Sequence, residues 1–114
     1  MFNTAAIDTI SKEYVEQINI IFADRLKKII LYGSYARGDF NEFSDIDVMI
    51  LVDMPDEEIK EKRWEIITVK CELDNKYDVF MSSIVKDVNH FNKLLPIVPF
   101  YQNVNDEGIV WYEH

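Results

Sequence analysis

Residues 29–53 decide how this chain folds: Ile-Ile-Leu-Tyr-Gly-Ser-Tyr-Ala-Arg-Gly-Asp-Phe-Asn-Glu-Phe-Ser-Asp-Ile-Asp-Val-Met-Ile-Leu-Val-Asp. The apolar run at 29–32 predicts a short buried strand. Gly33 and Ser34 follow it directly and predict a sharp turn into a polar loop. The loop ends where a second apolar run begins, so the stretch predicts two strands joined by a polar connection.

The second strand is expected over residues 45–52, and it carries two acids at its start. Asp45 and Asp47 are two residues apart, so their side chains share one face of a strand, with Cβ atoms about 6–7 Å apart. The residues between and after them point the other way, into a core: Ile46, Val48 and Ile50. Taken alone, two acids at this spacing are weak evidence of a site, and the alternative is a surface connection with solvated acids.

Beside a Gly-Ser turn, such a pair has a chemical use. Phosphate accepts hydrogen bonds from backbone N–H groups at close approach, which the missing Cβ of Gly33 allows, and Ser34 adds a hydroxyl donor. Mg²⁺ prefers oxygen ligands and usually takes one or two carboxylates together with substrate phosphates. Two such ions about 3.5–4 Å apart stabilise both the attacking and the leaving oxygen of an in-line displacement. Asp45 and Asp47 are therefore candidate metal ligands.

Gly33-Ser34, Ala36-Arg37-Gly38 and Ser44-Asp45-Ile46-Asp47 together resemble the signature of the DNA polymerase beta nucleotidyltransferase superfamily. More narrowly, they resemble the minimal nucleotidyltransferases, the antitoxin type often paired with HEPN-domain toxins. The resemblance implies ATP or another NTP as donor. It also implies Mg²⁺ as cofactor, with two ions expected and Mn²⁺ as a substitute.

The same resemblance asks for a third acid, on a strand next to the second one. Asp78, in the run Tyr77 to Met81, is the candidate with a strand-like context, and Asp74 and Asp53 are the alternatives. The implied catalytic and metal-binding set is thus Asp45, Asp47 and Asp78, with Asp78 taking the proton of the nucleophile.

Two further residues of the loop remain open. Arg37 either contacts the nucleotide phosphates or pairs with Asp39 or Glu42 to hold the loop. Ser44 either orients Asp45 and touches the nucleotide or simply caps a turn. With Gly33 and Ser34, they complete the expected nucleotide-binding set.

The 114 residues suit one domain, 1–114. Hydrophobic residues make up 48% of the chain, as in globular proteins. The single cysteine, Cys71, suits a reducing compartment, and we expect it to be buried. No apolar run approaches the roughly 20 residues that cross a bilayer, and the N-terminus does not resemble a signal peptide. These features predict a cytoplasmic protein without membrane contact.

The formal net charge is −9. An acidic domain repels the backbone of nucleic acids, so a long DNA or RNA partner is not expected. Nucleotides remain compatible, because bound cations reverse the sign of the charge at the site. The charge also favours a basic protein partner.

The remaining pattern predicts alternating helices and strands. Apolar residues at three- and four-residue spacing predict an amphipathic helix over 4–26. The other expected elements are helices at 35–39, 55–74 and 84–95, a helical turn at 100–103, and strands at 77–81 and 109–112. With the resemblance, this order gives an α/β fold: a two-layer sandwich with a mixed β-sheet and helices mainly on one face.

Three functions follow. The first is transfer of AMP from ATP to a hydroxyl of a HEPN-like toxin protein, as antitoxin of the pair. The second is an antitoxin that acts by binding alone, and the third is a nucleotidyltransferase for small molecules such as antibiotics. Late aromatic residues belong either to the core or to a partner surface in a homo- or hetero-oligomer: Phe100, Tyr101, Trp111 and Tyr112.

Overall fold

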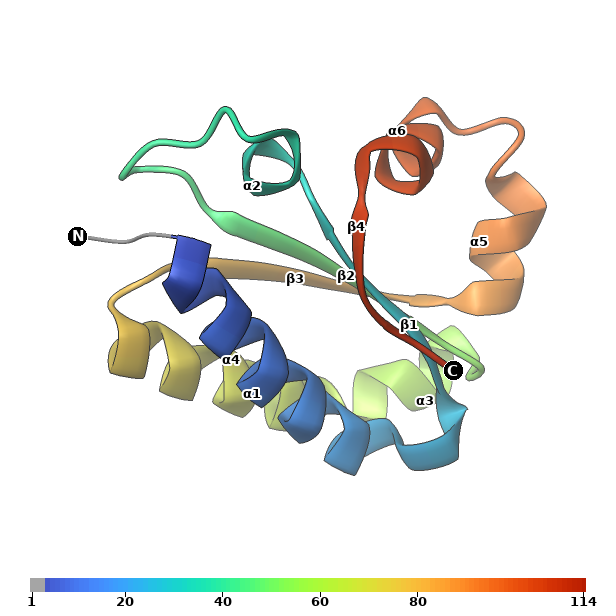
Figure 1. Cartoon of the computed structure of the whole chain (residues 1–114). Coiled ribbons are helices and arrows are strands. Elements are labelled where there is room, and N and C mark those ends of the chain that lie inside the picture. Colours follow the sequence, from blue (N-terminus) through green and yellow to red (C-terminus); the bar gives the residue numbers. More distant parts are fainter. Residues whose placement is uncertain (1–3) are drawn as a thin grey trace.

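A computed structural model describes residues 4–114, and its centre is a four-stranded mixed sheet (Figure 1). The strand order is β3-β2-β1-β4. β1 pairs antiparallel with both β2 and β4, whereas β2 pairs parallel with β3. The strands are β1 (Leu26–Tyr32), β2 (Ile46–Val52), β3 (Met81–Asp87) and β4 (Ile109–Glu113). The expected mixed sheet is confirmed.

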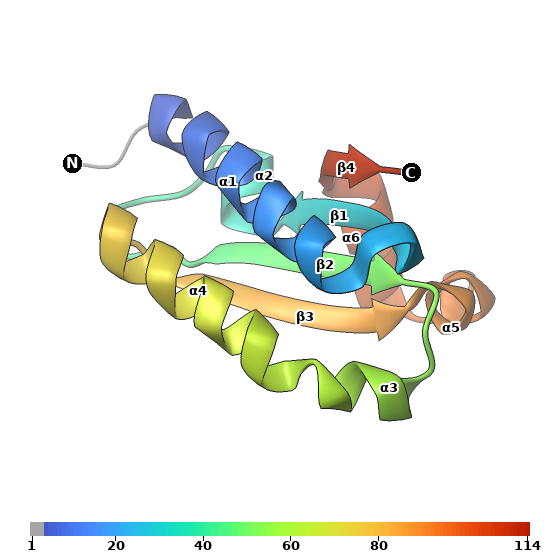
Figure 2. The same cartoon turned by 90° about the horizontal axis from the view of Figure 1, so that it is seen from below.

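Two long helices cover one face of the sheet. α1 (Thr4–Phe22) and α4 (Arg63–Tyr77) lie side by side across it (Figure 2). Ile10, Tyr14 and Ile18 of α1 follow one another at four-residue spacing and are completely buried. They pack on the strand residues predicted to face a core: Ile46, Val48 and Ile50. The predicted helix at 4–26 is confirmed as far as residue 22, and Ala23–Arg25 form a 3₁₀ turn.

Two shorter helices, α5 (Val88–Leu94) and α6 (Pro99–Glu107), cover part of the opposite face. Phe91, Tyr101 and Val104 are buried there against the sheet residues Ile30, Met49 and Leu51. The two-layer arrangement is thus confirmed for the long helices, and a smaller third group of helices adds to it. This second face is the one that carries Asp47.

Helix α2 (Ser34–Arg37) follows β1, and α3 (Asp56–Glu61) follows β2. The predicted single helix at 55–74 is divided, because α3 ends at Glu61 and α4 begins at Arg63, with Lys62 between them. The predicted turn at 100–103 belongs to the longer helix α6.

Two predicted elements are wrong. The strand predicted at 77–81 does not form, because α4 continues to Tyr77 and β3 begins only at Met81. The helix predicted at 84–95 is shorter, because Ile84 lies within β3 and α5 begins at Val88. The start of α5 is capped by Asp87, which accepts a hydrogen bond from the Asn89 N–H.

Two other expectations concern single features. Cys71 is exposed on α4 and not buried as predicted. Among residues 4–114, none of the helices has the length and apolar character needed to span a bilayer.

Candidate active site

The turn between β1 and α2 is built on Gly33. Its φ of 75° lies in the left-handed region, where only glycine is comfortable. A Cβ on Gly33 would clash with Oδ2 of Asp47, so any other residue at this position would displace the Asp47 carboxylate. The Gly33 carbonyl accepts hydrogen bonds from the N–H groups of Ala36 and Arg37, which begins the next helix. Glycine therefore lets the turn approach the Asp47 carboxylate directly.

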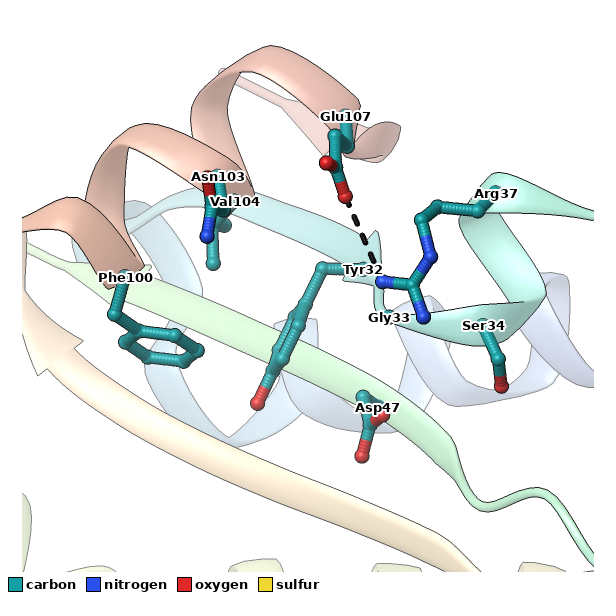
Figure 3. Close-up of a pocket in the computed structure, with 9 residues that line it drawn as sticks. All are labelled: Tyr32, Gly33, Ser34, Arg37, Asp47, Phe100, Asn103, Val104 and Glu107. Atoms are coloured by element: carbon teal, nitrogen blue, oxygen red, sulfur yellow. Dashed lines mark ion pairs between the residues drawn. The ribbon is translucent and has the colours of Figure 1, made fainter. Parts of the chain in front are cut away.

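A cavity of about 570 Å³ opens at this turn (Figure 3). Tyr32 and Asp47 are register partners in β1 and β2, so both side chains reach the same face of the sheet. The cavity takes its other wall from α6. Its lining residues are Tyr32, Gly33, Ser34, Arg37, Asp47, Phe100, Asn103, Val104 and Glu107. Its volume is in the usual range of small-molecule sites, about 300–1,000 Å³.

Asp47 is the acid that faces this cavity, and its charge is disfavoured. Partial burial raises its pKa, the neighbouring charge of Asp45 raises it further, and Arg37 opposes the rise. Burial, together with the Asp47 carboxylate, raises the pKa of Tyr32 to about 12. Within residues 4–114, no hydrogen-bond donor or ion-pair partner contacts the carboxylates of Asp45 and Asp47. Two unneutralised carboxylates beside each other suit a bound cation.

Arg37 lines the cavity but already has anionic partners. Its Nε lies 3.2 Å from Oδ2 of Asp39, and its Nη1 lies 3.6 Å from Oε2 of Glu107. Of the two acids expected as alternative partners of Arg37, Asp39 and Glu42, the structure pairs Asp39 with it. This pairing holds the loop, as one of the two interpretations of Arg37 expects. The pairing with Glu107 also ties α2 to α6, as the dashed line in Figure 3 marks.

Ser44 and Asp45 lie at a neighbouring depression of about 270 Å³. The Ser44 Oγ accepts a hydrogen bond from the Asn41 N–H at 3.0 Å, so Ser44 closes the turn before β2. Its position favours the turn-capping interpretation. Asp78 lines the same depression as Asp45, whereas Asp47 does not.

Asp78 has a different backbone setting from the one predicted. It ends α4 in a left-handed conformation with φ of 53°, and its N–H donates to the Asp74 carbonyl. It therefore precedes β3 and is not on a strand, so that expectation is wrong. Across residues 4–114, no three His, Cys, Asp or Glu side chains gather closely enough to hold a metal together. Asp78 therefore does not join Asp45 and Asp47 in a three-residue metal site in this structure. Its role in proton transfer stays a prediction.

The strand position beside Asp47 is occupied by Ser82. β2 and β3 are parallel with Asp47 opposite Ser82, and register partners share a face. Ser83 confirms the alternation, because its Oγ is 2.7 Å from the hydroxyl of Tyr14 in α1, on the opposite face. The place where a third acid would complete the site thus carries a hydroxyl.

The two alternative acids have structural roles. Asp74 Oδ1 accepts a hydrogen bond from the Met81 N–H at 2.8 Å, which joins the end of α4 to the start of β3. Asp53 follows the other end of β2 and accepts a hydrogen bond from Asn89. Neither faces the cavity.

The sequence interpretation missed the wall formed by α6. Phe100, Asn103, Val104 and Glu107 are spaced at three, four and seven residues, which places them on one helix face. That spacing is present in the sequence, but the local pattern predicts only a turn at 100–103. Tyr32 was predicted as part of a buried strand, and its half-buried ring instead forms the cavity floor between Phe100 and Asp47 (Figure 3).

Comparison with protein families matches a model described as "Nucleotidyltransferase domain" to residues 11–99. Two relatives come from Methanocaldococcus jannaschii. The one named "Putative protein adenylyltransferase MJ0604" is 40% identical over 101 residues, which are 89% of this chain and 93% of that protein. "Putative protein adenylyltransferase MJ0141" is 47% identical over 77 residues, which are 67% and 75% of the two chains.

Solved structures share the fold at low identity. One is described as a "toxin-antitoxin with AMP-PNP"; it aligns with a TM-score of 0.59 at 19% identity, over 91% of this chain and 73% of that one. A "putative nucleotidyltransferase from Sulfolobus solfataricus" aligns with a TM-score of 0.60 at 16% identity, over 99% and 91% of the chains.

Proposed function

Because this chain belongs to the nucleotidyltransferase domain family, we propose that it transfers AMP from ATP to a hydroxyl group of a partner protein. The observation that carries the proposal is the Gly33 turn, whose backbone faces the Asp47 carboxylate in one cavity. The names of the two archaeal relatives support adenylyl transfer to protein. The toxin-antitoxin structure with the same fold was solved with AMP-PNP, which supports an adenine nucleotide.

The residues at hand suit Mg²⁺ as cofactor. Asp45 and Asp47 offer carboxylate oxygens, and both lack a cationic neighbour in direct contact within the described part of the chain. When bound, the ion would neutralise these charges and those of the triphosphate. Mn²⁺ is the expected substitute. The expected second ion rests on a third acid, which this conformation does not bring to the pair.

The chain's own groups would bind and orient the triphosphate. Ser34 donates its hydroxyl at the turn, and Gly33 leaves room for phosphate oxygens. Arg37 would exchange its exposed contacts with Asp39 and Glu107 for phosphate, which is inexpensive because exposed ion pairs contribute only about 0–1 kcal/mol. Arg37 as a phosphate ligand is part of this proposal.

In the reaction, the acceptor oxygen attacks the α-phosphorus, and the bond from that phosphorus to the oxygen bridging to the β-phosphate breaks. AMP is then joined to the acceptor through a new P–O bond, and pyrophosphate leaves with the electron pair of the broken bond. The acceptor hydroxyl must lose its proton. Asp78 is our candidate to accept it, because it shares the depression that also exposes Asp45.

We propose a HEPN-like toxin as the acceptor protein, which the reaction would silence. The chain's net charge of −9 disfavours a nucleic-acid acceptor and favours a basic protein. A structure with the same fold belongs to a toxin-antitoxin complex. The alternatives are an antitoxin that acts by binding alone and a nucleotidyltransferase for small hydroxylated compounds.

The test is incubation of the chain with α-labelled ATP, Mg²⁺ and the protein encoded by the neighbouring reading frame. We expect label on that protein, and none when Asp45→Asn is combined with Asp47→Asn. A matched control changes two acids away from the site, Asp8→Asn with Asp24→Asn.

Protection of cells against the partner protein separates the alternatives. If the Asp45→Asn/Asp47→Asn chain still protects fully while labelling is lost, the binding-only antitoxin replaces the proposal. If a small hydroxylated compound is labelled and no protein is, the small-molecule enzyme replaces it.

A further inference from the structure

The cavity has two chemically different ends. Gly33, Ser34, Arg37 and Asp47 form a polar end that suits phosphate and a cation. The other end is formed by the first half of α6, where Phe100 contributes an aromatic ring and Asn103 an amide (Figure 3). The acid of this helix, Glu107, lies at its far end and pairs with Arg37. An apolar ring such as that of Phe100 offers phosphate no hydrogen-bond donor, so this end requires a separate explanation.

The aromatic ring at this end belongs to Phe100, and it is held in place while remaining accessible. Its centroid lies 5.5 Å from that of Tyr32, with the rings at 79° in an edge-to-face arrangement. Phe100 nevertheless keeps 41% of its surface exposed. A large apolar side chain on the wall of a cavity, positioned but uncovered, is suited to a planar ligand group.

The amide belongs to Asn103, three residues further along the same helix face. It is exposed, and its side chain has no hydrogen-bond partner anywhere in residues 4–114. An asparagine amide offers a donor and an acceptor side by side. It therefore matches a ligand edge with an acceptor next to a donor.

We propose that Phe100 and Asn103 bind the adenine base of ATP, a proposal that rests on the nucleotidyl-transfer function above. Phe100 stacks on the base, and Asn103 pairs with its N7 acceptor and its N6 amino donor. Asparagine matches this edge of adenine with two hydrogen bonds. Guanine presents two acceptors there, N7 and O6, so the amide carbonyl would face an oxygen. The base end of the cavity thus selects ATP over GTP.

The position of α6 fixes the distance between the two ends of the cavity. Glu107, at the end of the same helix face, pairs with Arg37 of α2 at 3.6 Å. Val104, which precedes Glu107 on α6, is buried against the sheet. The spacing between the phosphate end and the base end is therefore set by packing as well as by the ion pair.

The test is calorimetric titration of the chain with ATP, GTP and inorganic tripolyphosphate, each with Mg²⁺. We expect ATP to bind about tenfold more tightly than GTP, from the worth of one good asparagine–adenine pair. Phe100→Ala should weaken ATP about ten- to hundredfold, the range for loss of base stacking on an aromatic ring, and leave tripolyphosphate unchanged. Asn103→Ala should bring the ATP-to-GTP ratio close to one.

Matched controls come from exposed residues of the same types outside the cavity. Asn105→Ala changes an exposed asparagine of α6 that is absent from the cavity lining, and Trp64→Ala removes an exposed aromatic ring from α4. Neither should alter any of the three affinities. If Phe100→Ala does not fold, as judged by its melting temperature, Asn103→Ala still decides the question.

Two results would overturn the inference in distinguishable ways. If tripolyphosphate binds and both α6 variants bind ATP and GTP like the unchanged chain, the base is held elsewhere, while the proposed function stands. If neither ATP nor tripolyphosphate binds with Mg²⁺, the proposed function fails as well.

Discussion

At the scale of single residues, Asp47 carries an electrostatic cost in the absence of a ligand. Burial and the neighbouring Asp45 raise its pKa above the ordinary value. A carboxyl whose pKa is raised on folding stabilises the folded state when protonated, and this contribution is lost as the pH rises through the raised pKa. At neutral pH, the metal-free chain therefore tolerates an unfavourable charge here.

Asp47→Asn should accordingly raise the melting temperature of the metal-free chain at pH 7, and the gain should shrink as the pH falls below the ordinary carboxyl range. Mg²⁺ with ATP should stabilise the unchanged chain and have little effect on the variant, because ligand binding to the folded state alone shifts the equilibrium. Thermal melts in EDTA and in Mg²⁺ measure both. An Asp47→Asn chain that melts below the unchanged one at pH 7 would contradict this account.

Gly33 offers a second test at this scale. Gly33→Val places a branched side chain in a glycine-only backbone region and against Oδ2 of Asp47, so we expect a loss of about 1–3 kcal/mol in stability together with loss of nucleotide binding. Gly38→Ala is the matched control, because Gly38 also has a positive φ but a Cβ there meets nothing within 4 Å. It should lose some stability yet bind ATP. Equal ATP affinity in the two variants would argue against phosphate at this turn.

Asp78 is the group proposed to accept the proton of the attacking hydroxyl. Asp78→Asn should bind ATP normally and lose about 10²–10⁴-fold in turnover, the usual worth of a general base. Asp8→Asn, at an exposed position of α1, controls for loss of one charge. Single-turnover labelling of the partner protein measures the rate. If the rate of Asp78→Asn is close to that of the unchanged chain, another group accepts the proton.

At the scale of elements, the parallel pairing of β2 with β3 defines what the site lacks. Ser82 stands beside Asp47 on the same face, so a carboxylate at this position would approach the acid pair. Ser82→Asp should therefore tighten Mn²⁺ binding, measured as the decrease in the electron paramagnetic resonance signal of free Mn²⁺. Ser11→Asp adds the same charge on α1 and should not. Unchanged Mn²⁺ affinity in Ser82→Asp would show that the pair of acids does not bind the ion from this face.

The same strand explains why sequence reasoning succeeded for one half of the fold and failed for the other. The segments around 29–32 and 45–52 carry strong local signals: apolar runs, a glycine turn and alternating acids. Around β3 the signals conflict. Ile84, Val88, Phe91 and Leu95 have helical spacing, yet they reach the same apolar cluster from a strand, a helix and the segment after it. The spacing of apolar residues indicates which residues share a core, but it does not show whether each one lies in a strand, a helix or a loop.

The site shows the same division. Gly33, Ser34 and Asp47 were predictable because they are close in sequence and paired through neighbouring strands. The contribution of Phe100 and Asn103 depends on how α6 folds back over the sheet, 68 and 71 residues beyond Tyr32. No local pattern encodes that distance. Asp78 was misplaced for the related reason that the end of α4 is set by its packing and by the hydrogen bond from Met81 to Asp74.

At the scale of the whole molecule, charge sets the expected behaviour toward a partner. With 21 acidic and 12 basic residues, the chain attracts basic proteins over a range that salt shortens. Raising NaCl from about 50 to about 500 mM should slow partner labelling about tenfold or more at saturating ATP, since steering of this kind changes association rates by about 10–10³-fold. A matching concentration of sucrose controls for bulk solvent effects. A rate indifferent to salt would indicate an uncharged docking surface.

Helix α6 forms one wall of the cavity, and among the elements that line the cavity it is the last to be synthesised. β1, the Gly33 turn and β2 can emerge and pair while residues 99–113 are still being translated, but β1 then lacks its second neighbour β4. At about 5–20 residues per second, that interval lasts on the order of seconds. A nascent chain in this interval presents the Gly33 turn and both acids without the helix that completes the cavity. Under the proposed function, cellular ATP would therefore stabilise the protein only after α6 has emerged, and folding and nucleotide binding would be successive events during biosynthesis.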